Sequence, residues 1–228
     1  MTGHISSSAG PVPRGTADGS LTDLLAGVPV VPVVVLDSGR EVPALAAALR
    51  DGGLPCAEVT LRTPGALDAL RAFAREPGMV VGAGSVRTVD QVDEVVDAGA
   101  RFVVSPGLSA QVLARCRARG VPALPGVATA TEIMRALDAG VDVVKVFPVG
   151  RLGGPGGVRD LAAPFPGLRF VPTGGVRAAD LAEYLAVNAV AAVGGSWMVA
   201  APLVRAGRYD EVRRLTQECV TIAREVRP

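Results

Sequence analysis

The stretch DAGVDVVKVFP, residues 138–148, ends a predicted helix on glycine and begins an apolar strand at the next residue. The same handover recurs along the chain, as expected where helices cap on glycine and lead into buried parallel strands. About eight strand–helix units follow a short predicted helix at residues 20–26. The sequence therefore predicts an α/β fold, and specifically a (β/α)8 TIM barrel with a short N-terminal helix. An open doubly wound sheet is the alternative, although no predicted strand is followed by GxGxxG.

Length and composition favour one domain. The chain has 228 residues, of which 49% are hydrophobic, and Ala, Val, Leu and Gly dominate. This composition suits buried parallel strands covered by helices rich in small residues. We expect residues 20–228 to form a single barrel domain. Residues 1–19 are rich in Ser, Gly and Pro and are predicted to be a flexible tail.

Charge and cysteine content narrow the possible partners. The formal net charge is +1, and acids and bases are spread along the chain, so we expect neither nucleic acid nor membrane binding. Cys56, Cys116 and Cys219 form no CxxC pair, and His4 is the only histidine. We therefore expect a cytoplasmic protein that binds small molecules and uses no metal and no cofactor. The apolar stretch 187–204 is broken by Gly, Asn, Ser and Pro and is predicted as a buried strand and a turn.

Lys145 is the only lysine of the chain. Period-two alternation places it on the same strand face as Val143 and Phe147, and we expect that face to point into the barrel. Loss of water disfavours an ammonium ion, and a partly neutral amine can attack a ketone, whereas an arginine would stay charged and could form no imine. Lys145 is therefore a candidate nucleophile. The alternative is a snorkelling or ion-paired lysine in an arginine-rich chain.

The segment EVTLRT, residues 58–63, carries a carboxylate and a guanidinium on one strand face. Alternation puts Glu58 deeper in the predicted barrel than Arg62, which lies at the mouth. A recessed Glu58 could carry protons, and Arg62 could bind a carboxylate with two parallel hydrogen bonds. A purely structural Glu–Arg pair is the alternative.

Two glycine turns, PTGG (172–175) and VGGS (193–196), end the last two predicted strands. Exposed backbone N–H groups at these positions of a barrel commonly hold a phosphate group. The glycine-rich LGGPGG, residues 152–157, is predicted to be a mobile lid or a plain linker without substrate contact. The candidate residues for this phosphate site are Thr173, Gly174, Gly175, Gly195 and Ser196.

Seven short motifs occur in an order that resembles a known family: EVTLRT (58–63), GAGS (82–85), SPG (105–107), PGVAT (125–129), KVFP (145–148), PTGG (172–175) and GGSW (194–197). Together they resemble the class I 2-keto-3-deoxy-6-phosphogluconate (KDPG) and 4-hydroxy-2-oxoglutarate (KHG) aldolases. The resemblance extends from about Leu24 to Tyr209.

The resemblance implies a (β/α)8 barrel, commonly a homotrimer, that cleaves KDPG to pyruvate and glyceraldehyde 3-phosphate. Some relatives also cleave KHG to pyruvate and glyoxylate. By resemblance, Lys145 forms the Schiff base, Glu58 carries the proton, and Arg62 holds the substrate carboxylate. The remaining implied contacts are Ser85 at the carboxylate end, Pro106 and Phe147 as pocket walls, and Thr173, Gly174, Gly175, Gly195 and Ser196 at the hydroxyl and phosphate groups.

The chain departs from the usual pattern of that family at a few positions. Many relatives have Thr where Ser85 stands, and many carry Arg near the end of the first strand, where this chain has Val35 and Leu36. The missing arginine favours the gluconate over the galactonate branch of the family. A phosphosugar isomerase or epimerase, a metal-dependent pyruvate aldolase and a barrel that only binds a sugar phosphate are the other hypotheses.

Overall fold

Parallel strands alternate with helices throughout residues 20–227, the part of the chain that this computed structural model describes. All eight predicted strand positions are occupied, and the fifth is divided into two short strands. The predicted tail, residues 1–19, lies outside the described residues. The strands are β1 (Val30–Val34), β2 (Cys56–Thr60), β3 (Val80–Gly84), β4 (Phe102–Val104), β5 (Ala123–Leu124), β6 (Gly126–Val127), β7 (Val143–Val146), β8 (Arg169–Pro172) and β9 (Val193–Gly195).

The strands form two parallel sheets. One contains β5, β4, β3, β2, β1 and β9 in that order, and the other contains β6, β7 and β8. Only Pro125 separates β5 from β6, and because proline has no N–H it interrupts the ladder where the chain passes between the sheets. Isolated bridges from Phe170 to Val190 and from Thr173 to Gly194 link β8 to the segment of β9. The α/β fold with a curled parallel sheet is confirmed, but the hydrogen-bonded ladder is not one continuous eight-stranded sheet.

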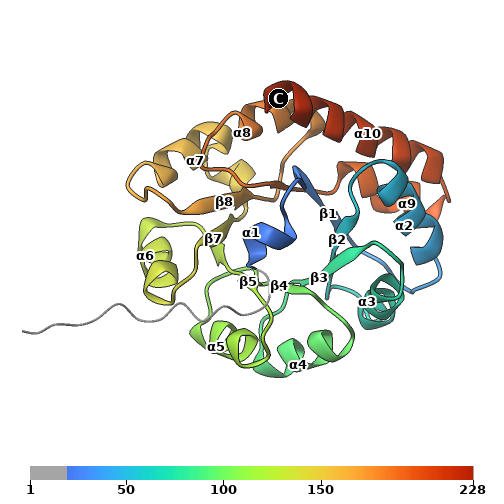
Figure 1. Ribbon diagram of the computed structural model, residues 1–228, viewed down its shortest axis with the longest axis horizontal. Coiled ribbons are helices and arrows are strands. Elements are labelled where there is room, and N and C mark those ends of the chain that lie inside the picture. The colour runs from blue at the N-terminus through green and yellow to red at the C-terminus, as the bar shows by residue number, and fades with distance from the viewer. Residues whose placement is uncertain (1–19, 228) are drawn as a thin grey trace, which may run out of the picture.

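The helices surround the strands (Figure 1). Several begin with a side chain that accepts a hydrogen bond from the first turn, including Thr88, Ser109 and Thr129, which fixes where each helix starts. The helices are α1 (Leu21–Leu24), α2 (Val42–Asp51), α3 (Ala66–Ala74), α4 (Val89–Asp97), α5 (Ala110–Ala118), α6 (Ala130–Asp138), α7 (Gly154–Ala162), α8 (Leu181–Leu185), α9 (Ala201–Arg205) and α10 (Tyr209–Val226), with 3-10 turns at Val149–Arg151, Ala178–Asp180 and Trp197–Val199.

Two segments differ from the sequence-based expectation. The LGGPGG segment is not a linker, because α7 begins within it at Gly154. Gly153 precedes the helix with φ 87°, and Pro155 lies in the first turn, where its fixed φ suits a helix start. A side chain at Gly157 would overlap the carbonyl of Leu152, so glycine permits this tight entry. The apolar stretch 187–204 holds not only β9 and a turn but also the start of the short helix α9, which was not predicted.

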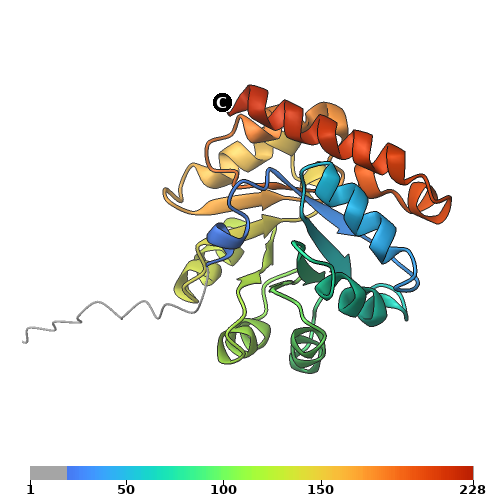
Figure 2. The ribbon, with the colours of Figure 1, turned by 45° about the vertical axis from the view of Figure 1, so that its right-hand side comes forward.

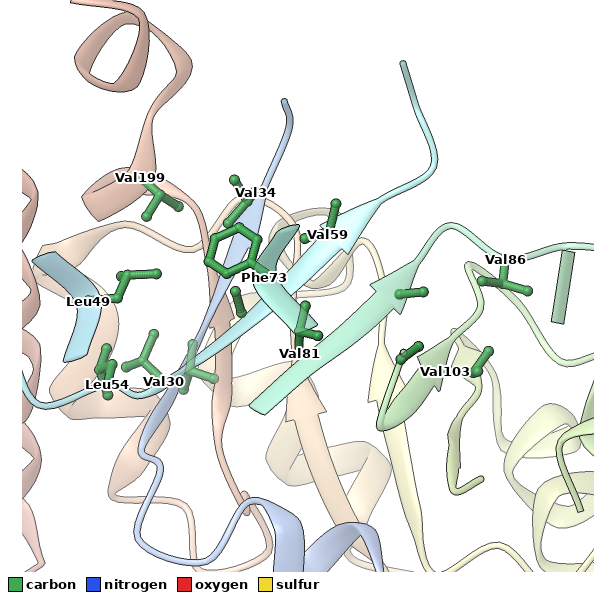
Figure 3. Packing of buried hydrophobic residues seen from close by; sticks show 14 of the residues in the cluster. Val30, Val34, Leu49, Leu54, Val59, Phe73, Val81, Val86, Val103 and Val199 are labelled. Carbon is green, nitrogen blue, oxygen red and sulfur yellow. The ribbon is translucent and has the colours of Figure 1, made fainter. Parts of the chain in front are cut away.

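Most buried apolar side chains lie between the strands and the surrounding helices. Val34, Val59 and Val81, one from each of β1, β2 and β3, belong to one cluster with Phe73 of α3 (Figure 3). Burial of this kind contributes about 25 cal/mol per Å2 of apolar surface. This layer holds the helices against the sheets and leaves alternate strand residues free to face inward.

A second cluster lies inside the ring of strands and is called here the interior cluster. α1 lies at the centre of this ring in the view of Figure 1, and Leu21 of α1 and its C-cap residue Leu25 belong to the cluster. A capping box between Ser20 and Asp23 fixes the start of α1. The short N-terminal helix therefore fills the interior away from the carboxyl ends of the strands. The members are Leu21, Leu25, Val31, Phe102, Val104, Leu124, Val143, Val171 and Ala192.

α10, the last helix, packs beside one of the first helices of the fold. It packs against α2 and α8 and lies along the outside of the molecule (Figure 2). Arg227, at its C-terminal end, donates hydrogen bonds to the carbonyls of Leu185 and Val190. Within residues 20–227, no helix is both long enough and apolar enough to cross a membrane.

Leu21→Ala tests whether α1 is needed to fill the interior. Leu21 is 3% exposed, so truncation leaves a cavity, and we expect the free energy of unfolding to fall by about 2–4 kcal/mol. Glu94→Ala, a truncation at an exposed position of α4, should cost less than about 0.5 kcal/mol. Urea denaturation of both variants measures the difference. A Leu21→Ala protein as stable as the control would contradict this role of α1.

Candidate active site

A buried ion pair joins the two sheets across the interior. Lys145 of β7 donates from Nζ to Oε1 of Glu58 at 3.1 Å and to Oε2 at 3.3 Å. The side chains of Lys145 and Glu58 are only 5% and 3% exposed. β2 belongs to the six-stranded sheet and β7 to the three-stranded sheet. Two residues 87 positions apart in the sequence are therefore in direct contact.

Each member of this pair compensates the charge of the other. Removal of one partner from a buried pair typically costs about 3–5 kcal/mol, because the remaining charge is left without water or a counter-ion. Transfer of one proton from Nζ to the carboxylate would leave a neutral amine and a neutral acid, so no isolated charge would result. Nζ also lies 5.5 Å from the centroid of the Phe147 ring, a position that favours a cation. The amine and the carboxylate are therefore close enough for direct proton transfer between them.

A cavity of about 140 Å3 lies beside Lys145 at the carboxyl ends of the strands. Ligand sites of parallel α/β folds occur at this end of the sheet. Most of the residues predicted for a substrate site lie in its wall; Glu58, Ser85 and Pro106 do not. The wall is formed by Val33, Val35, Arg62, Lys145, Phe147, Thr173, Gly174, Gly175, Val176, Gly194, Gly195 and Ser196.

Two valines of this wall, Val33 and Val176, were missed by the sequence analysis. Val33 belongs to β1, in which every residue is apolar and buried, so no alternation in the sequence distinguishes its inner face. Val176 follows directly after PTGG and could have been found only by extending that motif. Both valines add apolar surface to the cavity wall.

Arg62 is exposed at the rim of the cavity and is held by Ser85. Its Nε donates to Ser85 Oγ at 3.1 Å. Ser85 adopts φ 61°, a left-handed conformation that is uncommon for residues other than glycine. Among residues 20–227, no carboxylate lies within 4.0 Å of the Arg62 guanidinium. Its outer N–H groups can therefore bind an anion.

The two glycine turns form part of the cavity wall. Gly174 and Gly175 have φ values of 88° and 85°, which glycine adopts without strain. A Cβ on Gly174 would lie 2.9 Å from the Phe147 ring. A Cβ on Gly194 would lie 2.8 Å from Cγ2 of Thr173. Glycine thus lets the backbone approach the cavity closely enough for its N–H groups to contact a ligand.

Pro106, the remaining candidate, lies outside the cavity wall. Pro106 is exposed, and its carbonyl covers Gly126, where a Cβ would overlap it. Cys56 lies two residues before Glu58 on β2, and burial raises the pKa of its thiol to about 12, so it stays protonated. Within the described part of the chain, no three His, Cys, Asp or Glu side chains lie together as metal ligands would.

The fold and the site together define an α/β protein with a small-molecule cavity over a buried lysine–carboxylate pair. The chain belongs to the KDPG and KHG aldolase family, whose sequence model matches residues 21–215. The 2-dehydro-3-deoxy-phosphogluconate aldolase of Treponema pallidum is 46% identical over 204 residues, which cover 89% of this chain and 97% of that protein. The KHG/KDPG aldolase of Escherichia coli K12 is 42% identical over 202 residues, which cover 88% of this chain and 95% of that protein.

A solved structure has the same fold. The KDPG aldolase of Legionella pneumophila superimposes with a TM-score of 0.83 at 37% identity, covering 86% of this chain and 96% of that chain. That crystal contains pyruvate captured at low pH as a covalent carbinolamine intermediate.

Arg62→Ala should weaken pyruvate binding about 10- to 100-fold, the usual loss when a charged hydrogen-bond partner is removed. Ser85→Ala should weaken it less, by about 2- to 10-fold, because the guanidinium remains but loses its neutral hydrogen bond. Arg87→Ala, which removes an exposed arginine outside the cavity wall, is the matched control. Half-saturation in borohydride trapping of pyruvate measures all three. Equal binding by Arg62→Ala and Arg87→Ala proteins would refute the role of Arg62.

Proposed function

We propose that this protein is a class I aldolase that cleaves KDPG to pyruvate and glyceraldehyde 3-phosphate, and that it also cleaves KHG to pyruvate and glyoxylate. The buried contact between Lys145 Nζ and the Glu58 carboxylate is the observation that carries this proposal. It provides an amine that can be neutral and a proton carrier within hydrogen-bond distance of it.

The reaction begins when Glu58 takes a proton from Lys145 and the neutral amine attacks the C2 ketone of the substrate. Glu58 returns this proton to the ketone oxygen, and loss of water from the carbinolamine gives an iminium ion. The Glu58 carboxylate then removes the proton of the C4 hydroxyl, the C3–C4 bond breaks, and its electron pair passes into an enamine. Protonation of C3 and hydrolysis release pyruvate and restore Lys145. The iminium ion is the electron sink, so the mechanism requires no cofactor.

The other proposed roles follow the geometry of the cavity wall. Arg62 binds the C1 carboxylate, and Ser85 holds Arg62 in place through its Nε. Phe147 packs beside the reacting carbon, and Pro106 lies at the outer edge. The backbone N–H groups of the glycine turns bind the phosphate, and nearby hydroxyl groups bind those of the substrate, a set made up of Thr173, Gly174, Gly175, Gly195 and Ser196.

Two other activities are less well supported. A galactonate-type aldolase would keep the same chemistry, but Val35, which lines the cavity, stands near the position where many relatives carry arginine. A phosphosugar isomerase or epimerase would use Glu58 as a base and would form no bond between Lys145 and pyruvate. Trapping of pyruvate therefore separates an aldolase from an isomerase.

Lys145→Met should abolish cleavage, because no other lysine can form the imine. Wild-type protein treated with pyruvate and borohydride should gain the mass of one reduced adduct on Lys145. Lys145→Arg is the matched control for charge: it keeps a cation beside Glu58 but cannot form an imine, and it should also be inactive. Peptide mass spectrometry and a pyruvate-release assay measure both effects. An adduct elsewhere, or an active Lys145→Arg protein, would overturn the proposal.

We also propose that the eight strand positions close into one (β/α)8 barrel that forms a single domain over residues 20–228. The bridges between β8 and the β9 segment and the packing of α10 on α2 and α8 support this closure. A cytoplasmic location is proposed from the three buried cysteines, all of them free thiols.

A homotrimer is proposed from the family resemblance and from two apolar side chains on α6, Met134 and Leu137, which are 57% and 42% exposed. Light scattering should give a mass about three times that of the 23.1 kDa chain. A double replacement of Met134 and Leu137 by lysine should shift the mass towards one chain if α6 lies in the contact. Wild-type protein with the mass of a single chain would refute the trimer.

A further inference from the structure

The inner face of β3 carries two glycines, and each leaves space that a side chain from a neighbouring strand fills. A Cβ on Gly82 would overlap the ring of Phe102 from β4, whereas a Cβ on Gly84 would overlap Oε1 of Glu58 from β2. β2 and β3 pair in parallel, with Glu58 opposite Gly82 and Thr60 opposite Gly84. The Glu58 side chain thus leans along its strand, away from its paired residue Gly82 and over Gly84, two residues further along β3.

We propose that Gly84 is a positioning residue for the proton carrier Glu58. Because Gly84 has no side chain, the Glu58 carboxylate can occupy the space beside it and contact Lys145 there. A Cβ at position 84 would lie 2.8 Å from both Cγ and Cδ of Glu58. Such an approach is too close for any real Cβ. Both oxygens of this carboxylate lie within hydrogen-bond distance of Lys145 Nζ, so a carboxylate pushed aside by alanine loses this alignment. This inference rests on the proposed aldolase function.

The requirement at position 84 is for space and not for a special backbone conformation. Gly84 is absent from the glycines with positive φ, so alanine can adopt its backbone angles without strain. The group in the way is the end of a flexible side chain, which can rotate. Gly84→Ala should therefore fold and yet lose catalysis, whereas Gly82→Ala would press on the fully buried, rigid ring of Phe102 and should chiefly lower stability.

Gly84→Ala should lower kcat for KDPG cleavage about 10- to 100-fold and leave KM within about twofold, because proton transfer is impaired and substrate binding is not. It should equally slow the exchange of the pyruvate methyl protons in D2O, followed by NMR, since that exchange also requires a base beside the iminium ion. Gly156→Ala, at a helix position where a Cβ meets nothing within 4 Å, is the matched control and should behave as the wild type.

A double-mutant cycle tests whether the effect passes through Glu58. Glu58→Ala removes every side-chain atom beyond Cβ and therefore vacates the space beside Gly84. The Gly84→Ala change should then lower the residual rate of the Glu58→Ala protein by less than about twofold, and this double variant should fold even if Gly84→Ala alone does not. A loss of the same size in both backgrounds would overturn the inference, as would a Gly84→Ala protein with wild-type kcat.

The wild-type protein separates this inference from the function on which it rests. If the wild type exchanges the methyl protons of pyruvate and the Gly84→Ala variant exchanges them equally fast, the inference is wrong and the aldolase function stands. If the wild type neither exchanges these protons nor traps pyruvate, the proposed function fails, and the inference fails with it.

Discussion

The contact between Lys145 and Glu58 is the interaction on which the rest of the site depends. Two charged side chains taken out of water are stable only if each satisfies the other, and a lone buried charge costs several kcal/mol. This contact also fixes the distance between β2 and β7, which belong to different sheets. The same pair that has to be complete for stability also provides an amine and a proton acceptor in direct contact. Structural need and proposed chemistry therefore place the same constraint on these two residues.

Glycines near the ion pair leave space that side chains from neighbouring strands occupy. Gly84 leaves room for the Glu58 carboxylate, Gly194 leaves room for Thr173, and Gly82 accommodates Phe102. In parallel sheets, residues in register share a face, so a glycine on one strand creates a recess that a longer side chain from the next strand can enter.

Apolar side chains fill part of the interior of the ring of strands. The interior cluster, which includes Leu21 of α1 and its C-cap residue Leu25, packs inside the ring of strands. The cavity lies beside Lys145, and exposed Arg62 stands at its rim. A substrate anion would therefore meet a guanidinium first and the amine afterwards, which orients the ketone towards Lys145 without any movement of the strands.

The sequence alone determined the order of the strands and helices along the chain, the parallel α/β class and the candidates Lys145 and Glu58, which the structure brings into contact. Hydrophobic periodicity and glycine caps are local properties, and a single lysine in an apolar strand is visible without coordinates. Only the tertiary structure decided that Pro125 divides the fifth strand, that LGGPGG begins α7, and that Val33 and Gly84 border the site. These features depend on contacts between segments that are distant in the sequence. A run of apolar or glycine residues does not indicate which residues of the neighbouring strands it will contact.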